Sequence, residues 1–256
     1  MTSEMKLGAM NNPEKDVLKE LKFFGELGFD FFELAVEGPR AFPELLTERK
    51  KKILDLLSSY DMALLTHLPW FFEIGHPYEG VRRAYLKETL KVVDIAVELE
   101  AEKLGLHINV PKGRFPDKLD YNLNALREIE GYASDKGLPV CVENLDLKVF
   151  DLDDFHRILD TGVGFLWDIG HANMGLLNEE DIFLFLELKD QLMHVHAHDN
   201  DGRDDLHLPI GAGKIDWKKV VKELKRVYDG TVTLEIHSQD RDYLKISREK
   251  FLELWK

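Results

Sequence analysis

Short apolar runs alternate with longer charged segments along the whole chain. The apolar runs are rich in Val, Leu, Ile and Phe, and eight can be counted, at residues 6–10, 31–36, 63–69, 103–109, 139–145, 164–171, 192–200 and 232–237. Runs of this length and composition predict buried β-strands. The segments between them carry apolar residues at helical spacing, which predicts helices at 13–27, 45–60, 80–99, 121–136, 153–160, 179–189, 217–228 and 247–255.

Individual residues support some of the helix boundaries. Gly28 and Gly137 follow predicted helices and have the freedom to adopt the left-handed conformation of a C-terminal cap. Thr47 opens the sequence Thr-Glu-Arg-Lys, which predicts a capped helix start at that residue.

The order of the predicted elements indicates the fold. Repeated βα units predict parallel strands joined by right-handed crossovers. Eight units favour closure into an α/β, (β/α)8 TIM barrel with its active site at the C-terminal face of the strands. An open doubly wound sheet is the alternative, but it usually has fewer strands, and no Gly-rich dinucleotide or phosphate-binding pattern follows the first run. With no interior linker, we expect residues 1–256 to form a single domain.

Composition narrows the class of protein. A hydrophobic share of 44% and a charged share of 32% are typical of a soluble globular protein. The net charge of −14 argues against nucleic acid as a partner, although a local basic rim would override it. No apolar window reaches the length of a membrane span and no leader-like segment is recognised, so we expect no membrane association and a cytoplasmic location. The single cysteine, Cys141, lies in an apolar run and is expected to be a buried thiol. Whether the chain forms a homo-oligomer stays open.

Ionisable side chains stand at the C-terminal ends of nearly all the predicted strands. The strand cores of a parallel barrel are apolar, so such residues need an explanation. Of ten histidines, only His76 and His156 fall outside the strands and their following loops. The residues at or near the strand ends are Glu33, His67, His107, Glu143, Asp168, His171, His196, His198, Glu235 and His237.

Alternation along the strands predicts that these groups converge. Side chains of a strand point to alternate faces, so His194, His196 and His198 share one face. Carboxylates packed together would repel one another, and a divalent cation with N and O ligands removes the conflict. Ion pairs with Lys or Arg are the alternative interpretation, but few basic residues lie near the last four strands. We assign His194 to the barrel core and leave open whether Glu33 and His237 line the pocket.

Two loops carry further candidates. The segment 198–217 is long, polar and glycine-rich, which is typical of functional loops, and Arg203 within it is a candidate for binding an anionic or hydroxylated substrate. Its glycines would allow a ligand to approach the backbone closely. After the third strand, Trp70, Phe71 and Phe72 form an aromatic cluster that would either stack on a sugar or cover the barrel edge.

Several motifs together resemble the xylose isomerase-like TIM-barrel superfamily, which contains sugar-phosphate isomerases and epimerases and the endonuclease IV group (AP endonuclease family 2). The motifs are Val142-Glu143-Asn144, Trp167-Asp168-Ile169-Gly170-His171, His194-Val-His196-Ala-His198-Asp199, His207-Leu-Pro-Ile-Gly211-Ala-Gly213 and Leu234-Glu235. The resemblance spans essentially the whole chain. It is specific for the superfamily but not for one reaction within it.

The epimerase branch implies one set of roles. By resemblance, Glu143, Asp168, His196 and Glu235 would bind a divalent metal, either Zn²⁺, Mn²⁺, Co²⁺ or Mg²⁺. Glu143 and Glu235 would be the catalytic acid and base, and the candidates for substrate binding are His171, Arg203, His67 and Trp70. The implied activity is that of a sugar or sugar-phosphate isomerase or epimerase acting through a metal-stabilised enediolate.

The endonuclease branch implies an alternative. Each of the nine zinc ligands of endonuclease IV has a similar residue in this chain. By this resemblance, the possible metal ligands are the four residues named above together with His67, His107, His171, Asp205 and His207. A zinc-dependent phosphodiester hydrolase acting at abasic sites is therefore the second hypothesis. The Gly213-Lys-Ile-Asp-Trp217 ending of the long loop looks more like the isomerase branch. A non-catalytic metal-binding or sugar-binding barrel is the third hypothesis.

Overall fold

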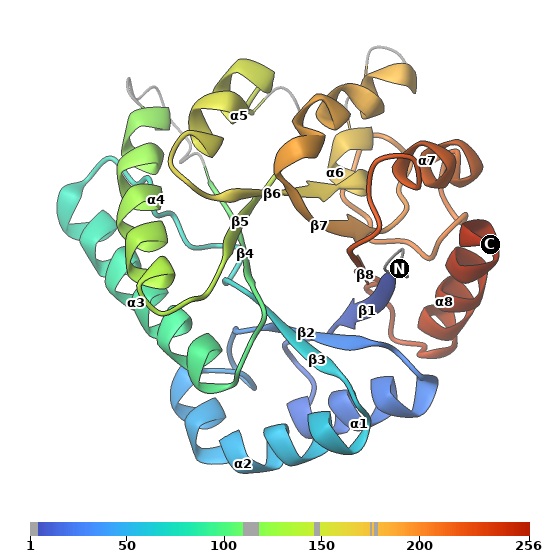
Figure 1. The fold of residues 1–256 in the computed structure, drawn as a ribbon, viewed down its shortest axis with the longest axis horizontal. Helices are drawn as coiled ribbons and strands as arrows, with labels where there is room; N and C mark the ends of the chain where they lie inside the picture. Colours follow the sequence, from blue (N-terminus) through green and yellow to red (C-terminus); the bar gives the residue numbers. More distant parts are fainter. Residues whose placement is uncertain (1–4, 110–117, 146–148, 175, 177–178) are drawn as a thin grey trace.

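Eight parallel strands close into a barrel in the computed structural model, which describes residues 5–109, 118–145, 149–174, 176 and 179–256. Each strand pairs with its neighbours in sequence, and the first pairs with the last, as Figure 1 shows. The strands are β1 (Lys6–Met10), β2 (Phe31–Ala35), β3 (Ala63–His67), β4 (Leu104–His107), β5 (Val140–Glu143), β6 (Gly164–Asp168), β7 (Leu192–Ala197) and β8 (Thr231–Leu234). The predicted (β/α)8 TIM barrel is confirmed.

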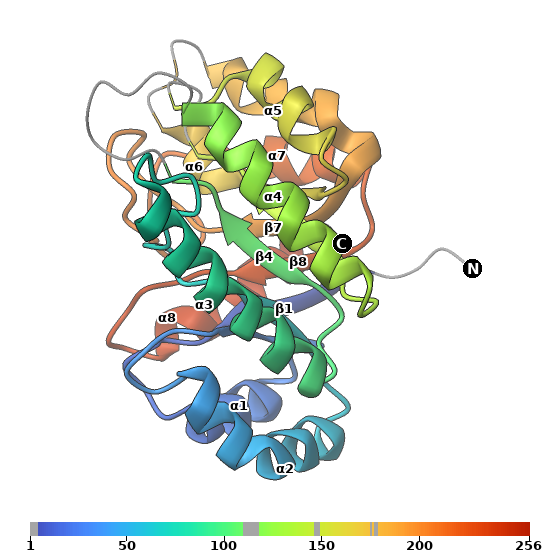
Figure 2. The same cartoon turned by 90° about the vertical axis from the view of Figure 1, so that its left-hand side faces the viewer.

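Helices surround the barrel on its outside, and the turned view shows α3 and α4 running along it (Figures 1 and 2). They are α1 (Val17–Leu27), α2 (Pro43–Ser59), α3 (Glu79–Glu98), α4 (Lys118–Ser134), α5 (Leu152–Leu159), α6 (Ile169–Asn173), α7 (Trp217–Leu224) and α8 (Asp242–Trp255), with a 3₁₀ segment η1 (Glu179–Gln191). Their apolar faces pack on the strands. Phe155 of α5, for example, meets Phe165 of β6 and Phe185 of η1 at ring-centroid distances of 5.6 Å.

The strand register aligns the ionisable residues. His107 of β4 is the Cα partner of Glu143 on β5, and Asp168 of β6 is the partner of His196 on β7. These pairs lie at the C-terminal ends of their strands. The sheet therefore brings residues from distant parts of the chain to one rim of the barrel.

Seven of the eight strands end earlier than predicted, and three of them, β6, β7 and β8, end three residues earlier. We expected residues 164–171 to be extended, but the Asp168 carboxylate accepts a hydrogen bond of 2.6 Å from the His171 backbone N–H and begins helix α6 there. His171 thus lies on a helical turn. The strands predicted at 192–200 and 232–237 end at Ala197 and Leu234.

Two other predictions about helices were wrong. Helix α2 begins at Pro43, because the fixed backbone of proline suits the first helical turn, and Thr47 lies inside the helix with its hydroxyl bonded to the Pro43 carbonyl. The segment predicted as a helix at 179–189 is the 3₁₀ segment η1. The left-handed cap at Gly28 is confirmed by its φ of 73°. None of the described helices is both long and apolar enough to cross a membrane.

Candidate metal centre

Four side chains meet at the C-terminal ends of β5 to β8. The Nδ1 atom of His196 lies 3.5 Å from an oxygen of Glu143 and 3.8 Å from an oxygen of Asp168. The same nitrogen lies 3.4 Å from Oε2 of Glu235, which follows β8 directly. Glu143, Asp168 and His196 are fully buried. One imidazole nitrogen surrounded by three carboxylates is a donor set that divalent cations take.

Polar atoms in this group lack the hydrogen bonds that buried atoms normally have. Within the part of the chain that the structure describes, Asp168 Oδ2 and His196 Nδ1 have no hydrogen-bond partner. Leaving a buried polar atom unpaired costs about 1–3 kcal/mol, so each such case needs an explanation. A cation between His196 and the carboxylates would use these lone pairs. The residues therefore fit a metal centre.

Protonated imidazoles balance the carboxylates when no cation is bound. Burial acts to raise the pKa of Glu143, but His107 and His196 outweigh burial and hold this pKa well below its usual range. Burial acts to lower the pKa of His196, but Glu33 and Glu143 hold it well above its usual value. A bound cation would take over this positive charge and release protons.

A second group of ligand-type residues shares Glu143. Its Oε2 lies 3.1 Å from Nε2 of His67 and 2.8 Å from Nε2 of His107. Nδ1 of His67 lies 2.8 Å from the Leu68 carbonyl, which holds the proton on Nδ1 and leaves Nε2 free to act as a ligand. His67 and His107 were predicted as possible additional ligands, and their Nε2 atoms lie close to the carboxylate of Glu143, which was predicted as one of the four main ligands.

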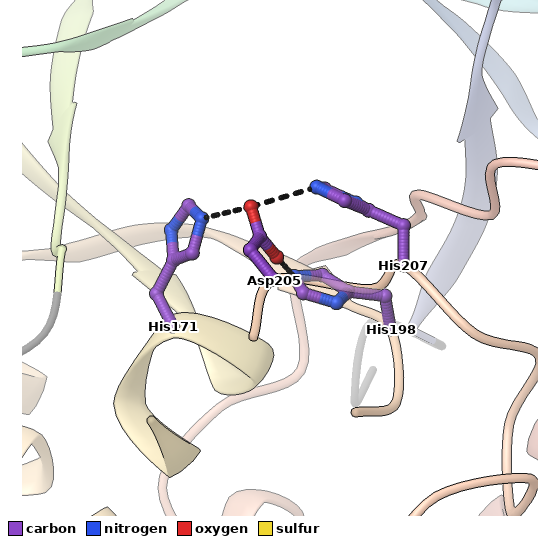
Figure 3. A group of neighbouring side chains, drawn as sticks. All are labelled: His171, His198, Asp205 and His207. Atoms are coloured by element: carbon purple, nitrogen blue, oxygen red, sulfur yellow. Dashed lines mark hydrogen bonds and ion pairs between the residues drawn. The ribbon is translucent and has the colours of Figure 1, made fainter. Parts of the chain in front are cut away.

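A third group is built around Asp205 (Figure 3). Oδ2 of Asp205 lies 3.2 Å from Nε2 of His171 and 3.0 Å from Nε2 of His207, and Oδ1 lies 3.6 Å from His198. The second ring nitrogens of His171 and His207 lie 3.0 and 3.2 Å from the backbone carbonyls of Asn144 and Glu235. His171 and His207 thus repeat the arrangement of His67.

The backbone at His207 is strained. Its φ of 44° is in the left-handed region, which residues other than glycine rarely adopt. Non-glycine residues held in this region gather at functional sites.

The pKa of His207 is raised to about 9, because Glu235 and Asp205 outweigh its burial.

Asp199 organises the loop that carries Asp205 and His207. This buried carboxylate accepts hydrogen bonds from the backbone N–H groups of Asn200, Gly211 and Ile215 at 2.9, 2.8 and 3.2 Å and from the Trp217 indole at 2.9 Å. A Cβ atom on Gly213 would lie 2.2 Å from the Asn200 carbonyl oxygen. Close packing within the loop thus accounts for Gly213, and not the approach of a ligand to the backbone that we had expected.

Glu33 lies beneath the first group. Its Oε1 is 3.2 Å from Nε2 of His196, and its Oε2 is 3.1 Å from Nε2 of His194 and accepts a hydrogen bond from the Thr233 hydroxyl. Glu33 therefore supports His196 from the side away from Glu143, and it does not line the cavity described below. His194 lies in the barrel core as predicted, and burial lowers its pKa to about 4.

A cavity of about 410 Å³ opens beside the first and second groups. The residues that line it include His67, His107, Trp70, Glu235 and His237. Arg203 is exposed and is not among the described residues that line the cavity. Asn11 and Glu37 also line it, and we did not predict them. Asn11 directly follows β1 and Glu37 comes two residues after β2, and this position after a strand is the signal that could have identified them.

Comparisons with known proteins give a consistent result. The family model described as xylose isomerase-like TIM barrel matches residues 21–253. A solved D-tagatose 3-epimerase-like protein is 27% identical with a TM-score of 0.84, and the match covers 98% of each chain. The chain is 26% identical to the fructoselysine 3-epimerase of Shigella flexneri over 90% of both chains. It is 28% identical to an uncharacterized protein of Methanocaldococcus jannaschii, over 93% of this chain and 88% of that protein.

Proposed function

This chain belongs to the xylose isomerase-like TIM barrel family, and from that premise we propose that it is a divalent-metal-dependent sugar isomerase or epimerase. The observation that carries the proposal is the unpaired Nδ1 atom of His196 facing three carboxylates. Similarity to a D-tagatose 3-epimerase-like protein and to fructoselysine 3-epimerase supports epimerisation of a ketose.

Glu143, Asp168, His196 and Glu235 are the residues proposed to bind the metal. When bound, the cation supplies positive charge beside the substrate carbonyl, which stabilises an enediolate. The pKa of Glu143 and that of Glu235 are both held well below the usual range, because neighbouring histidines outweigh burial. Both side chains are therefore ionised and able to accept a proton.

Glu143 and Glu235 are also the proposed acid and base. Glu143 ends β5 and Glu235 follows β8, which are not neighbouring strands, so we propose that the two carboxylates reach a substrate at the metal centre from two directions. One carboxylate would remove a proton from the carbon next to the carbonyl, and the other, after taking up a proton from solvent, would return that proton to the carbon from the other side. This exchange inverts the carbon, which is the outcome of an epimerase.

Turnover of a sugar panel tests the proposal. The purified chain is loaded with Mn²⁺, Co²⁺, Mg²⁺ or Zn²⁺ and assayed with ketoses and aldoses. We expect turnover that is lost on chelation and in the double variant Glu143→Gln, Glu235→Gln, and retained in Glu253→Gln, which changes an exposed carboxylate on α8. Equal turnover in the double variant and the unmodified chain would refute the proposed mechanism.

Zinc-dependent phosphodiester hydrolysis is the second candidate. It is favoured by the second and third groups, in which His67, His171 and His207 each keep Nδ1 on a backbone carbonyl and turn Nε2 toward a carboxylate. Cleavage of a duplex with an abasic site, together with three zinc ions per chain by elemental analysis, would select this function over the first. Metal binding without turnover of either substrate class would instead indicate a non-catalytic barrel.

A further inference from the structure

The cavity beside the metal centre has one wall built by loops. Residues 11–14, 37–39 and 70 form this loop wall, and His67, His107 and Glu235 line the same cavity. Glu14 and Glu37 are its charged residues, and no Lys or Arg is among the described residues that line the cavity. Lys15 and Arg241 line a separate, smaller cavity. The loop wall therefore presents negative charge to a ligand.

Glu37 forms no ion pair with a Lys or Arg within the described residues, and His67 is its positive neighbour. Its side chain is half-buried and accepts a hydrogen bond from the Trp70 backbone N–H, but it forms no ion pair there. Burial raises the pKa of Glu37, as expected for a carboxylate without a neighbouring Lys or Arg. The Glu37 carboxylate is therefore free to form an ion pair with a cationic group of a ligand.

Trp70 provides an aromatic surface at the same wall. The residue is 62% exposed, although large apolar side chains are usually covered, and its ring contacts Phe71 edge to face at 5.7 Å. An indole face beside a carboxylate is a combination that attracts alkylammonium groups, because the ring face is electron-rich.

Asn11 indicates that the wall receives a polar ligand. The residue is 1% exposed, and its Oδ1 accepts a 2.8 Å hydrogen bond from the Ala35 N–H. Its Nδ2 has no hydrogen-bond partner among the residues that the structure describes. The residue nevertheless lines the cavity, so a polar group lies close to any ligand bound at this wall.

We propose that the loop wall is a subsite for a cationic group, and that the preferred substrate is a ketose carrying an ammonium group rather than a phosphate. This inference rests on the proposed epimerase function. The metal centre would hold the reacting carbons at the inner end of the cavity, while Glu37 and Trp70 hold the ammonium group. A phosphate at the loop wall would meet Glu14 and Glu37, and among the described residues no Lys or Arg lines the cavity to offset their charge.

Matched substrates test the subsite. The kcat/KM of the Mn²⁺-loaded enzyme is measured with fructose derivatives that carry an amino, hydroxyl or phosphate group at the same carbon, in one series at C1 and in another at C6. Both ends are tested, because either end of the sugar can lie at Glu37 when the reacting carbons are at the metal centre. We expect the amino derivative to be preferred over the hydroxyl compound by about tenfold in one series, a ratio typical of one such charged contact.

Variants then assign the preference to its residues. Glu37→Gln and Trp70→Ala should each reduce the ratio of kcat/KM for the amino and hydroxyl compounds toward one, while Glu253→Gln should leave it unchanged. A ratio within one variant does not depend on the fraction of folded enzyme. If the phosphate derivative is preferred, or if Glu37→Gln leaves the ratio unchanged, the subsite is refuted while the epimerase function stands. If no ketose is turned over, both the subsite and the epimerase function are refuted.

Discussion

Replacing Glu33 by Gln tests whether the carboxylate beneath His196 prepares the metal centre. Glu33 is fully buried and lies 3.2 Å from Nε2 of His196, the ring nitrogen that faces away from the three carboxylates. A carboxylate at this position holds the proton on Nε2, turns Nδ1 toward the metal and makes the imidazole more basic. The affinity of the centre for metal should therefore depend on Glu33, although Glu33 does not touch the cation.

The structure sets the size of the effect. In Glu33→Gln the amide oxygen can still accept from His196, and the amide NH₂ can face His194 and the Thr233 hydroxyl, both of which are within reach of the present Oε2. The variant keeps the hydrogen bond but loses the charge. Metal affinity should fall by about tenfold, at the lower end of the range of 10–100-fold for such outer residues. Glu33→Ala removes the hydrogen bond as well and should reach about 100-fold, or roughly 2.7 kcal/mol.

Competition with a chromophoric chelator measures the affinity for Zn²⁺ and Co²⁺. The Co²⁺ absorption spectrum reports whether the ligand geometry survives in the variants. His194→Phe is a useful companion, because it removes a partner of Glu33 and leaves the contact between Glu33 and His196. The reasoning is refuted if both Glu33 variants bind metal as tightly as the unmodified chain, or if His194→Phe weakens binding more than Glu33→Ala does.

Three further predictions concern the scaffold. Asp199→Asn should lower the free energy of unfolding by about 1–3 kcal/mol, because an amide NH₂ must then face N–H donors; a chemical denaturation midpoint equal to that of the unmodified chain would contradict this. Phe155→Ala should cost about 3–5 kcal/mol by the same measurement, since it opens a cavity between α5, β6 and η1, whereas a loss below 1 kcal/mol would show that the packing collapses into the space. Cys141 should not react with a thiol reagent at pH 8 until the chain is unfolded, because burial raises its pKa to about 12 and keeps the thiolate population negligible; rapid labelling of the native protein would contradict this.

The barrel and much of its rim could be predicted from the sequence for a simple physical reason. Strands of a parallel barrel are buried, so their apolar runs are distinct, and an ionisable residue that closes such a run is conspicuous. His67, His107, Glu143 and Asp168 each end a strand in the structure. Alternation along β7 placed His194 and His196 on one face, and the position of His194 one layer deeper correctly assigned it to the core below His196.

Details that depend on tertiary contacts could not be predicted from the sequence pattern. The residues around Asp168 have the composition of a strand, yet a single side-chain hydrogen bond to the His171 N–H begins a helix there. The glycine at position 213 indicated close approach, but only the folded loop identifies Asn200 as the group that approaches. Glu37 and Asn11 lie in loops, where the sequence has no regular alternation of apolar and polar residues that would identify them. Only the folded structure shows that both line the same cavity.

The pairing of β1 with β8 has a consequence for how the centre forms. Candidate ligands come from β3 through β8, and the ring of strands closes only when the first and last segments of the chain meet. The segment from β5 to β8 holds all four proposed metal ligands, but Glu33, which supports His196, comes from β2 and reaches His196 only in the folded ring of strands. High-affinity capture of a cation should thus appear late in refolding, after the two ends have joined, and a metal added during refolding would act as a reporter of that final step.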